Sequence, residues 1–233
     1  MILKVCGVRT PDNVRELSEI DVDWVGLVFW PESPRYVKQI AARGGFYPDY
    51  SSFAKTSKEL GGMPEEARKA HKPLRVGVFV DGMPQNIVTR VYNFNLDLVQ
   101  LHGDELPCMI DNLRRTLDPD IRPVKIIKTI FVEKAEDLQV CKDYEGVVDY
   151  FLFHNKTASM GGSGEKFNWN VLEAYDGKVP FLLSGGIGPD DVEAVKSFSH
   201  PMFAGIDVNS CFEIEPGVKD MDKVRAFVKA VKG

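Results

Sequence analysis

Eight short apolar runs, rich in β-branched residues, alternate along this chain with polar stretches of helical spacing. The runs are continuously apolar, which is typical of strands buried on both faces of a parallel sheet. They occupy residues 2–6, 23–29, 74–80, 96–101, 122–128, 149–154, 179–184 and 202–208. Eight strand-helix alternations favour a (β/α)8 barrel over a doubly wound sheet, and no G-x-G-x-x-G sequence follows the first run. We therefore predict an α/β fold with a closed parallel barrel of eight strands.

The polar stretches carry apolar residues at helical intervals, as Ile87, Val91 and Phe94 do. They predict helices over residues 11–20, 84–94, 104–117, 132–144, 168–175, 189–198 and 220–231. Residues 41–72 are rich in Gly, Ser, Lys and Glu, so we expect a lengthened surface segment there that also holds the second helix. A chain of 233 residues suits one such barrel, and we expect a single domain over residues 1–233.

Composition narrows the possible partners and compartments. No run of eighteen apolar residues and no charged-then-apolar leader is present, so we expect a cytoplasmic protein with no membrane association. The formal net charge of -5 argues against nucleic acid as a partner. The four cysteines are widely spaced without a C-x-x-C pair, which suggests free thiols in a reducing compartment and neither a metal site nor a disulfide framework.

Cys6 ends the first run and precedes a glycine turn. Most free cysteines pack as small apolar residues, but active sites of such barrels form at the carboxyl ends of the strands. Polar side chains follow the other runs too; they include Arg35, Asp81, His102, Thr129, His154, Ser184 and Asp207. Asp81 precedes a predicted helix and is read as a capping residue. His102 suits packing or loop shape as well as catalysis, so it receives no catalytic role.

Three turns of small residues follow the last strands. They contain Gly162 and Gly164, Gly185 and Gly186, and Asn209 and Ser210. Glycines let backbone N–H groups approach an anion, and barrels often bind phosphate after strands seven and eight. We therefore expect a phosphorylated small-molecule substrate. Arg35, in a proline-bounded turn, is placed to grip a carboxylate through two parallel hydrogen bonds.

Seven motifs, in order along nearly the whole chain, resemble the phosphoribosylanthranilate isomerase family of tryptophan biosynthesis. They are Lys4-Val5-Cys6-Gly7, Gly26-Leu27-Val28-Phe29 with Ser33-Pro34-Arg35-Tyr36, Val76-Gly77-Val78-Phe79-Val80, Val99-Gln100-Leu101-His102-Gly103, Gly161-Gly162-Ser163-Gly164, Leu183-Ser184-Gly185-Gly186-Ile187, and Gly205-Ile206-Asp207-Val208-Asn209-Ser210. The resemblance implies an Amadori rearrangement of N-(5-phosphoribosyl)anthranilate to its 1-deoxyribulose 5-phosphate isomer, with no metal or organic cofactor and with the protein as a monomer or homodimer.

The resemblance also implies roles for individual residues. Cys6 matches the cysteine that acts as general base, and Arg35 the arginine that holds the anthranilate carboxylate. Asp207 would contact the sugar or aid the proton transfers. The phosphate would lie against the glycine turns described above and against the backbone of Asn209 and Ser210.

The chain departs from the family pattern at the end of the sixth run. The family's general acid there is an aspartate, whereas this chain has His154. An imidazolium can donate a proton near neutral pH, although it is larger than a carboxylate and opposite in charge. Catalysis with His154 as the acid and an impaired or silent phosphosugar-binding barrel therefore both remain open.

Two further enzyme classes are less consistent with the sequence. The histidine-pathway isomerase resembles a pattern with aspartate, not Cys6, at the end of strand one. A Cys6–His154 pair for hydrolysis would need a third orienting residue and an oxyanion-hole motif, and neither is apparent in the sequence.

Overall fold

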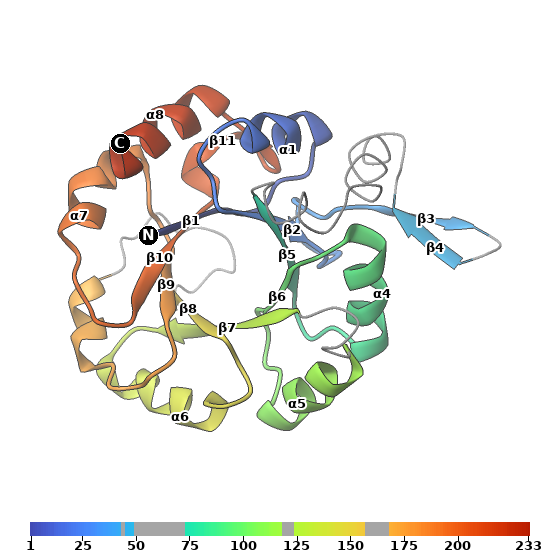
Figure 1. Cartoon of the computed structure of the whole chain (residues 1–233), viewed down its shortest axis with the longest axis horizontal. Helices are drawn as coiled ribbons and strands as arrows, with labels where there is room; N and C mark the ends of the chain where they lie inside the picture. The colour runs from blue at the N-terminus through green and yellow to red at the C-terminus, as the bar shows by residue number, and fades with distance from the viewer. Residues whose placement is uncertain (43–44, 49–72, 118–123, 157–167) are drawn as a thin grey trace, which may run out of the picture.

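The computed structural model describes residues 1–42, 45–48, 73–117, 124–156 and 168–233, and within them the chain forms a closed parallel barrel. Around the ring, the eight strands are β1 (Ile2–Val5), β2 (Trp24–Val28), β5 (Leu74–Phe79), β6 (Leu98–Leu101), β7 (Lys125–Val132), β8 (Tyr150–Asn155), β9 (Phe181–Ser184) and β10 (Phe203–Val208). The ring closes where β10 pairs with β1, with Asp207 beside Lys4 (Figure 1). The predicted (β/α)8 barrel is confirmed. Its single-domain organisation stays a prediction.

The fifth barrel strand differs most from the sequence prediction. It was expected over residues 122–128 and instead runs from Lys125 to Val132. The polar Thr129 suggests a strand end, but its hydroxyl lies inside the barrel and accepts a hydrogen bond from Gln100. The β-branched residues after Thr129 continue the ladder, so that Val132 pairs with Asn155 of β8.

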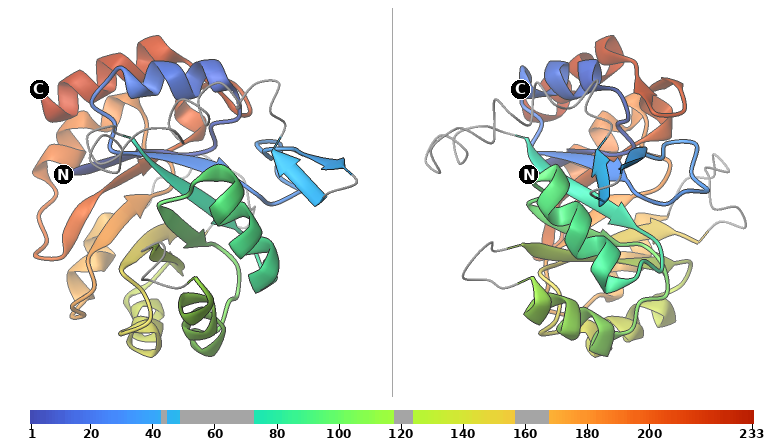
Figure 2. Two further views of the ribbon diagram at one scale, coloured as in Figure 1. Left: turned by 45° about the vertical axis from the view of Figure 1, so that its right-hand side comes forward. Right: turned by 90° about the vertical axis from the view of Figure 1, so that its right-hand side faces the viewer.

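Helices cover the outside of the barrel between the strands (Figures 1 and 2). The α-helices are α1 (Pro11–Ser18), α4 (Pro84–Phe94), α5 (Pro107–Thr116), α6 (Cys141–Tyr144), α7 (Val192–Ser197) and α8 (Met221–Lys232). Side-chain caps begin two of them, because Thr10 accepts the amide of Asn13 and Asp220 accepts that of Lys223.

Three predicted helices are wholly or partly 3-10 turns. These are η1 (Ala135–Val140), η2 (Trp169–Ala174) and η3 (Pro189–Asp191), with η1 leading into α6 and η3 into α7. Stretches this short gain little from the cooperative i→i−4 ladder, so tighter i→i+3 bonds satisfy the backbone. A further short turn, η4 (Ser210–Phe212), follows β10.

Two antiparallel hairpins accompany the barrel. One, β3 (Gln39–Ala42) with β4 (Gly45–Pro48), projects from the ring beyond β2 (Figures 1 and 2). The other, β11 (Glu213–Glu215) with β12 (Val218–Lys219), follows η4. The second helix expected within residues 41–72 falls largely outside the described residues. None of the helices in the described ranges combines the length and apolarity needed to cross a membrane.

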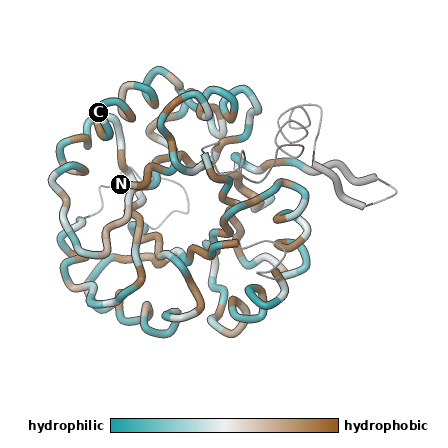
Figure 3. The backbone as a smooth tube through the Cα atoms, in the orientation of Figure 1, coloured by the Kyte–Doolittle hydropathy of each residue, from teal (hydrophilic) through white to brown (hydrophobic). Residues whose placement is uncertain are grey.

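The barrel interior is built in layers. Apolar side chains fill its lower layer; they are Trp24, Val76, Leu98, Ile127, Leu152 and Leu182. Two residues further along each strand the layer becomes mixed and mostly polar or small; it contains Gly26, Val78, Gln100, Thr129, His154 and Ser184. The hydropathy colouring sets the apolar strands of the ring apart from the more polar outer helices (Figure 3). The polar layer lies toward the carboxyl ends of the strands, where barrel enzymes carry their sites.

Candidate active site

Cys6 lies just beyond the end of β1, with its amide donating to Val208 O at 2.9 Å. Its side chain is buried, in a small cluster with Val28 and Val78. Gly26 on the neighbouring strand leaves the space for the thiol, because a Cβ atom there would lie 2.7 Å from the sulfur. Gly7 adopts a φ of +71°, and a Cβ at that position would lie 2.6 Å from both Arg35 and Asn209. The two glycines therefore allow the thiol, Arg35 and Asn209 to pack together.

Charged groups surround the Cys6 thiol. Burial raises its pKa, the nearby ammonium of Lys4 lowers it, and the carboxylate of Asp207 raises it. Lys219 contributes a smaller lowering. The net result is a pKa above the ordinary thiol value, so the resting side chain is the protonated thiol.

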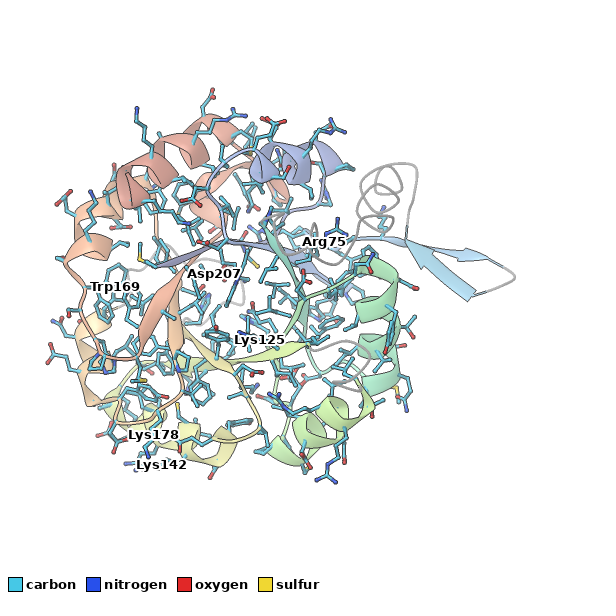
Figure 4. The ribbon with its side chains drawn as sticks, viewed as in Figure 1. Arg75, Lys125, Lys142, Trp169, Lys178 and Asp207 are labelled. Atoms are coloured by element: carbon cyan, nitrogen blue, oxygen red, sulfur yellow. The ribbon has the colours of Figure 1, made fainter. Side chains whose placement is uncertain are left out.

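Lys4 and Asp207 form a buried ion pair beside the thiol. The Lys4 ammonium lies 3.0 Å from Asp207 Oδ1 and donates to Gln100 Oε1 at 2.8 Å. Asp207 Oδ2 accepts a hydrogen bond from Ser184 at 3.4 Å, whereas Oδ1 has no partner in hydrogen-bond geometry among the described residues. Asp207 lies on the inner side of the ring, near β1 (Figure 4). One buried carboxylate oxygen is thus left available to a ligand.

His154 lies near the end of β8, beside Ser184 of β9 in the strand register. Its Nδ1 atom is 2.8 Å from the backbone oxygen of Asn155. A carbonyl oxygen only accepts, so Nδ1 carries the hydrogen and Nε2 is the atom that exchanges protons. The ring packs against Phe131 and, at right angles and 5.8 Å between centroids, against His102.

His102 belongs to this site, although sequence reasoning left it without a role. Its Nδ1 lies 3.0 Å from Thr129 Oγ1 and 3.3 Å from Gln100 Nε2. Because Lys4 donates to the Gln100 oxygen, the amide nitrogen points toward His102 and donates, which makes Nδ1 an acceptor and places the hydrogen on Nε2. Burial, with the neighbouring His154, lowers the pKa of His102 to about 3. The signal available in the sequence was its position two residues after Gln100, on the same strand face.

The low pKa of His102 predicts a loss of stability in acid. The unfolded chain binds a proton near the ordinary value of 6.5, whereas the folded chain does so only near 3, so protonation favours unfolding as pH falls below 6.5. Between pH 7 and pH 5 we expect the free energy of unfolding to fall by about 2 kcal/mol from this group. Urea unfolding at the two pH values measures the change. His102→Gln should show a smaller pH dependence, and an unchanged slope would contradict the assignment.

Arg35 makes the expected paired hydrogen bonds, but to a carboxylate within the chain. Its Nε and Nη2 atoms donate to the two oxygens of Glu213 at 2.9 and 2.6 Å. Glu213 also accepts from Lys219 at 2.8 Å and from the Gly217 amide at 3.0 Å. Burial alone would raise the pKa of Glu213, but the hydrogen bonds from Arg35 and Lys219 outweigh it and lower that pKa. Glu213 was missed because nothing local in its sequence marks it as a partner of Arg35.

The turns after β9 and β10 lie side by side. Gly185 and Gly186 have φ values of +96° and +73°, which a side chain would strain. The Cys211 sulfur lies 3.9 Å from the backbone oxygen of Gly186, so the second turn contacts the first. Lys219 holds this second turn by donating to Asn209 Oδ1 at 2.8 Å.

These turns leave backbone donors free for an anion. The amide N–H groups of Gly185, Gly186 and Ser210 donate no hydrogen bond to another residue within the described ranges. The position of these turns, after the last two barrel strands, and their exposed amide donors are those that the predicted phosphate site requires. Gly162 and Gly164, also expected there, lie outside the described residues.

A closed parallel barrel that presents a thiol, two imidazoles, an arginine and two neighbouring turns of small residues at one mouth defines a barrel enzyme of the acid–base class. A profile of the N-(5'phosphoribosyl)anthranilate (PRA) isomerase family matches residues 48–230. The chain belongs to this family, which confirms the resemblance seen in the sequence.

Individual relatives agree with the family match. The N-(5'-phosphoribosyl)anthranilate isomerases of Parabacteroides distasonis and Phocaeicola vulgatus are each 39% identical to this chain, over 99% and 100% of it and over 93% and 98% of their own lengths. The crystal structure of phosphoribosyl anthranilate isomerase from Thermotoga maritima superposes with a TM-score of 0.76 at 28% identity, with full coverage of both chains. A second solved isomerase, in complex with reduced 1-(o-carboxyphenylamino)-1-deoxyribulose 5-phosphate, gives 0.72 at 26% identity, also with full coverage of both chains.

Proposed function

We propose that this protein converts N-(5'-phosphoribosyl)anthranilate to 1-(2-carboxyphenylamino)-1-deoxyribulose 5-phosphate by acid–base catalysis. The observation that carries the proposal is the placement of Cys6 and His154 on opposite arcs of the same barrel mouth, with a glycine-lined anion site beside them. Its membership of the isomerase family supports the choice of substrate.

The proton transfers follow from the two side chains. His154, protonated at Nε2, donates that proton to the furanose ring oxygen, and the C1–O bond breaks to give a Schiff base. Cys6, as the thiolate, then removes the proton from C2, and the electron pair forms an enolamine. Tautomerisation of the enolamine gives the ketone product, and the two side chains exchange protons with water before the next cycle.

The remaining residues hold the substrate. The phosphate lies against the amides of Gly185, Gly186 and Ser210, with Asn209 shaping the turn. Arg35 contributes the remaining N–H groups of its guanidinium to the anthranilate carboxylate, while Glu213 keeps the fork in place. The Oδ1 atom of Asp207, which forms an ion pair with Lys4 but no hydrogen bond among the described residues, accepts a hydrogen bond from a sugar hydroxyl.

Loss of the Arg35 guanidinium should weaken substrate binding. We expect Arg35→Met to raise KM by about 10 to 100-fold, because a charge-assisted pair of hydrogen bonds contributes about 1.5 to 3 kcal/mol. Steady-state kinetics measure the effect. Arg15→Met is the matched control, since Arg15 is exposed and pairs with Asp12 on α1. A KM for Arg35→Met equal to that of the control would show that Arg35 does not bind the substrate.

The second candidate function is a phosphosugar-binding barrel without turnover. Two observations favour it: His154 replaces the aspartate that the family resemblance implies, and the Arg35 fork is already paired with Glu213. A turnover assay with freshly prepared substrate from about pH 5.5 to 8.5 separates the two. Turnover supports the isomerase. No turnover at any pH, with retained binding of the reduced product analogue, supports the silent barrel.

The proposal places the protein in the cytoplasm, with a phosphorylated small molecule as its partner, acting as a monomer or homodimer. All four cysteines are free, as expected in a reducing compartment. One related structure describes monomers generated from a dimeric isomerase of Thermotoga maritima, so both states occur among relatives.

A further inference from the structure

Lys4 is a fully buried lysine inside the barrel, on the same strand face as Cys6 and two residues before it. Burying an ammonium group costs free energy unless the group is paired, so the partners of Lys4 indicate its role. Three groups surround it: the Gln100 oxygen, the Asp207 carboxylate and the Cys6 sulfur. The proposed mechanism names Cys6 as the base and leaves Lys4 without a role.

The contacts of the Lys4 ammonium show which of its N–H groups are already used. One of its three N–H groups points at Gln100 Oε1 in good geometry. Asp207 Oδ1 is close enough for an ionic attraction but lies outside hydrogen-bond geometry. Asp207 therefore balances the charge of Lys4, and at least one N–H group of the ammonium is left for another acceptor.

The other cations near Cys6 are held by a different carboxylate. Arg35 and Lys219 both donate to Glu213, which pairs with their charges. His102 stays neutral above its low pKa, and His154 lies across the barrel on β8. Asp207 is the anion that acts against ionisation of the thiol. Of the cations near the sulfur, Lys4 lowers the pKa of Cys6 most, and it lies two residues before Cys6 on the same face of β1.

We propose that Lys4 is a positioning residue that stabilises Cys6 as the thiolate when the thiol acts as the base. A buried thiolate without a neighbouring cation would form too rarely to abstract a proton from carbon at a useful rate. The ammonium offsets that cost and aims the sulfur across the barrel mouth. The inference rests on the proposed function only for the role of Cys6 as the base.

The test measures the thiol directly, without turnover. Protein labelled with 13C at the cysteine Cβ is titrated by NMR, and the Cys6 signal is identified by its absence in Cys6→Ala. We expect Lys4→Met to raise the Cys6 titration midpoint by about 1 to 3 pH units, because an opposite charge within about 4 to 6 Å shifts a pKa by that amount. At fixed pH, kcat should fall about tenfold for each unit of that shift.

Lys128→Met is the matched control. Lys128 is also a buried lysine in an ion pair, with Glu105, but it lies on the outer face of β7 away from Cys6. The Lys128→Met substitution should leave the titration midpoint of Cys6 unchanged. A folded Lys4→Met protein whose Cys6 titrates as in the wild type would overturn the inference, as would an equal shift in the control.

A second pair of variants guards against loss of folding. Lys4→Met alone leaves Asp207 buried and unpaired, which can unfold the barrel. Comparing Asp207→Asn with Lys4→Met/Asp207→Asn avoids that orphaned carboxylate, and the same upward shift is expected between the two; no shift would refute the role of Lys4. If the wild type shows no turnover while the midpoint still moves, the proposed function fails and the electrostatic role of Lys4 stands.

Discussion

Cys6→Ala is expected to lower kcat by about 10² to 10⁴-fold, the usual contribution of a positioned acid or base. Without the sulfur no group at the tip of β1 removes the C2 proton, and the burial of this position limits replacement of the thiol by water. KM should change little, because the phosphate and carboxylate contacts come from other residues. The measurement is the steady-state rate of conversion of freshly prepared substrate, monitored by loss of anthranilate fluorescence.

Cys108→Ala is the control for this substitution, since Cys108 is an exposed cysteine near the start of α5. It should behave as the wild type. If Cys6→Ala keeps a kcat within a few-fold of that control, Cys6 is a packing residue and the base must be sought elsewhere.

His154→Gln should lower kcat by a similar factor of about 10² to 10⁴, because an amide cannot transfer a proton to the furanose oxygen. His154→Asp, which restores the carboxyl group that the family resemblance implies, should retain turnover at or above the wild-type rate. Its KM should change less than its kcat, because the proposed phosphate contacts are backbone amides, although the His154 ring lies beside Gly185, where a Cβ would be 3.6 Å from Cε1. Rapid kinetics at one pH compares kcat and KM for the wild type, His154→Gln and His154→Asp.

The outcome for His154→Asp also separates the two candidate functions. A modest change indicates that His154 is a working substitute for the aspartate. A rise of several orders of magnitude, with unchanged affinity for the reduced product analogue, indicates a barrel that His154 has disabled. His200→Gln controls for histidine loss, because the His200 ring bonds Tyr175 O and the Met202 amide, just before the start of β10.

The architecture was predictable because it depends on local patterns. Continuous apolar runs and helical spacing along the chain are enough to place eight strands and most helices to within a few residues. The largest errors fell where a polar residue lies inside the barrel, as Thr129 does, or where helices are too short to form full α-helical turns, as in residues 135–144. In both places tertiary contacts overrode the local signal.

The site was predictable only where its residues lie at strand ends. Cys6, His154, Gly185 and Gly186 were found by that rule, and the structure places each of them at the barrel mouth. His102 lies at a strand end as well, but its place in the site depends on its contact with His154. Local sequence carries no information about such a pairing.

The sequence by itself determined the barrel, the thiol at its mouth, the glycine turn after β9 and the family. Only the tertiary structure decided which charges meet: Lys4 with Asp207, and Arg35 with Glu213, residues separated by most of the chain. The physical reason is that periodicity and turn chemistry act between near neighbours, whereas barrel closure brings the first and last strands together. Electrostatic energies depend on those distances, so the protonation states of Cys6 and its neighbours are properties of the closed barrel.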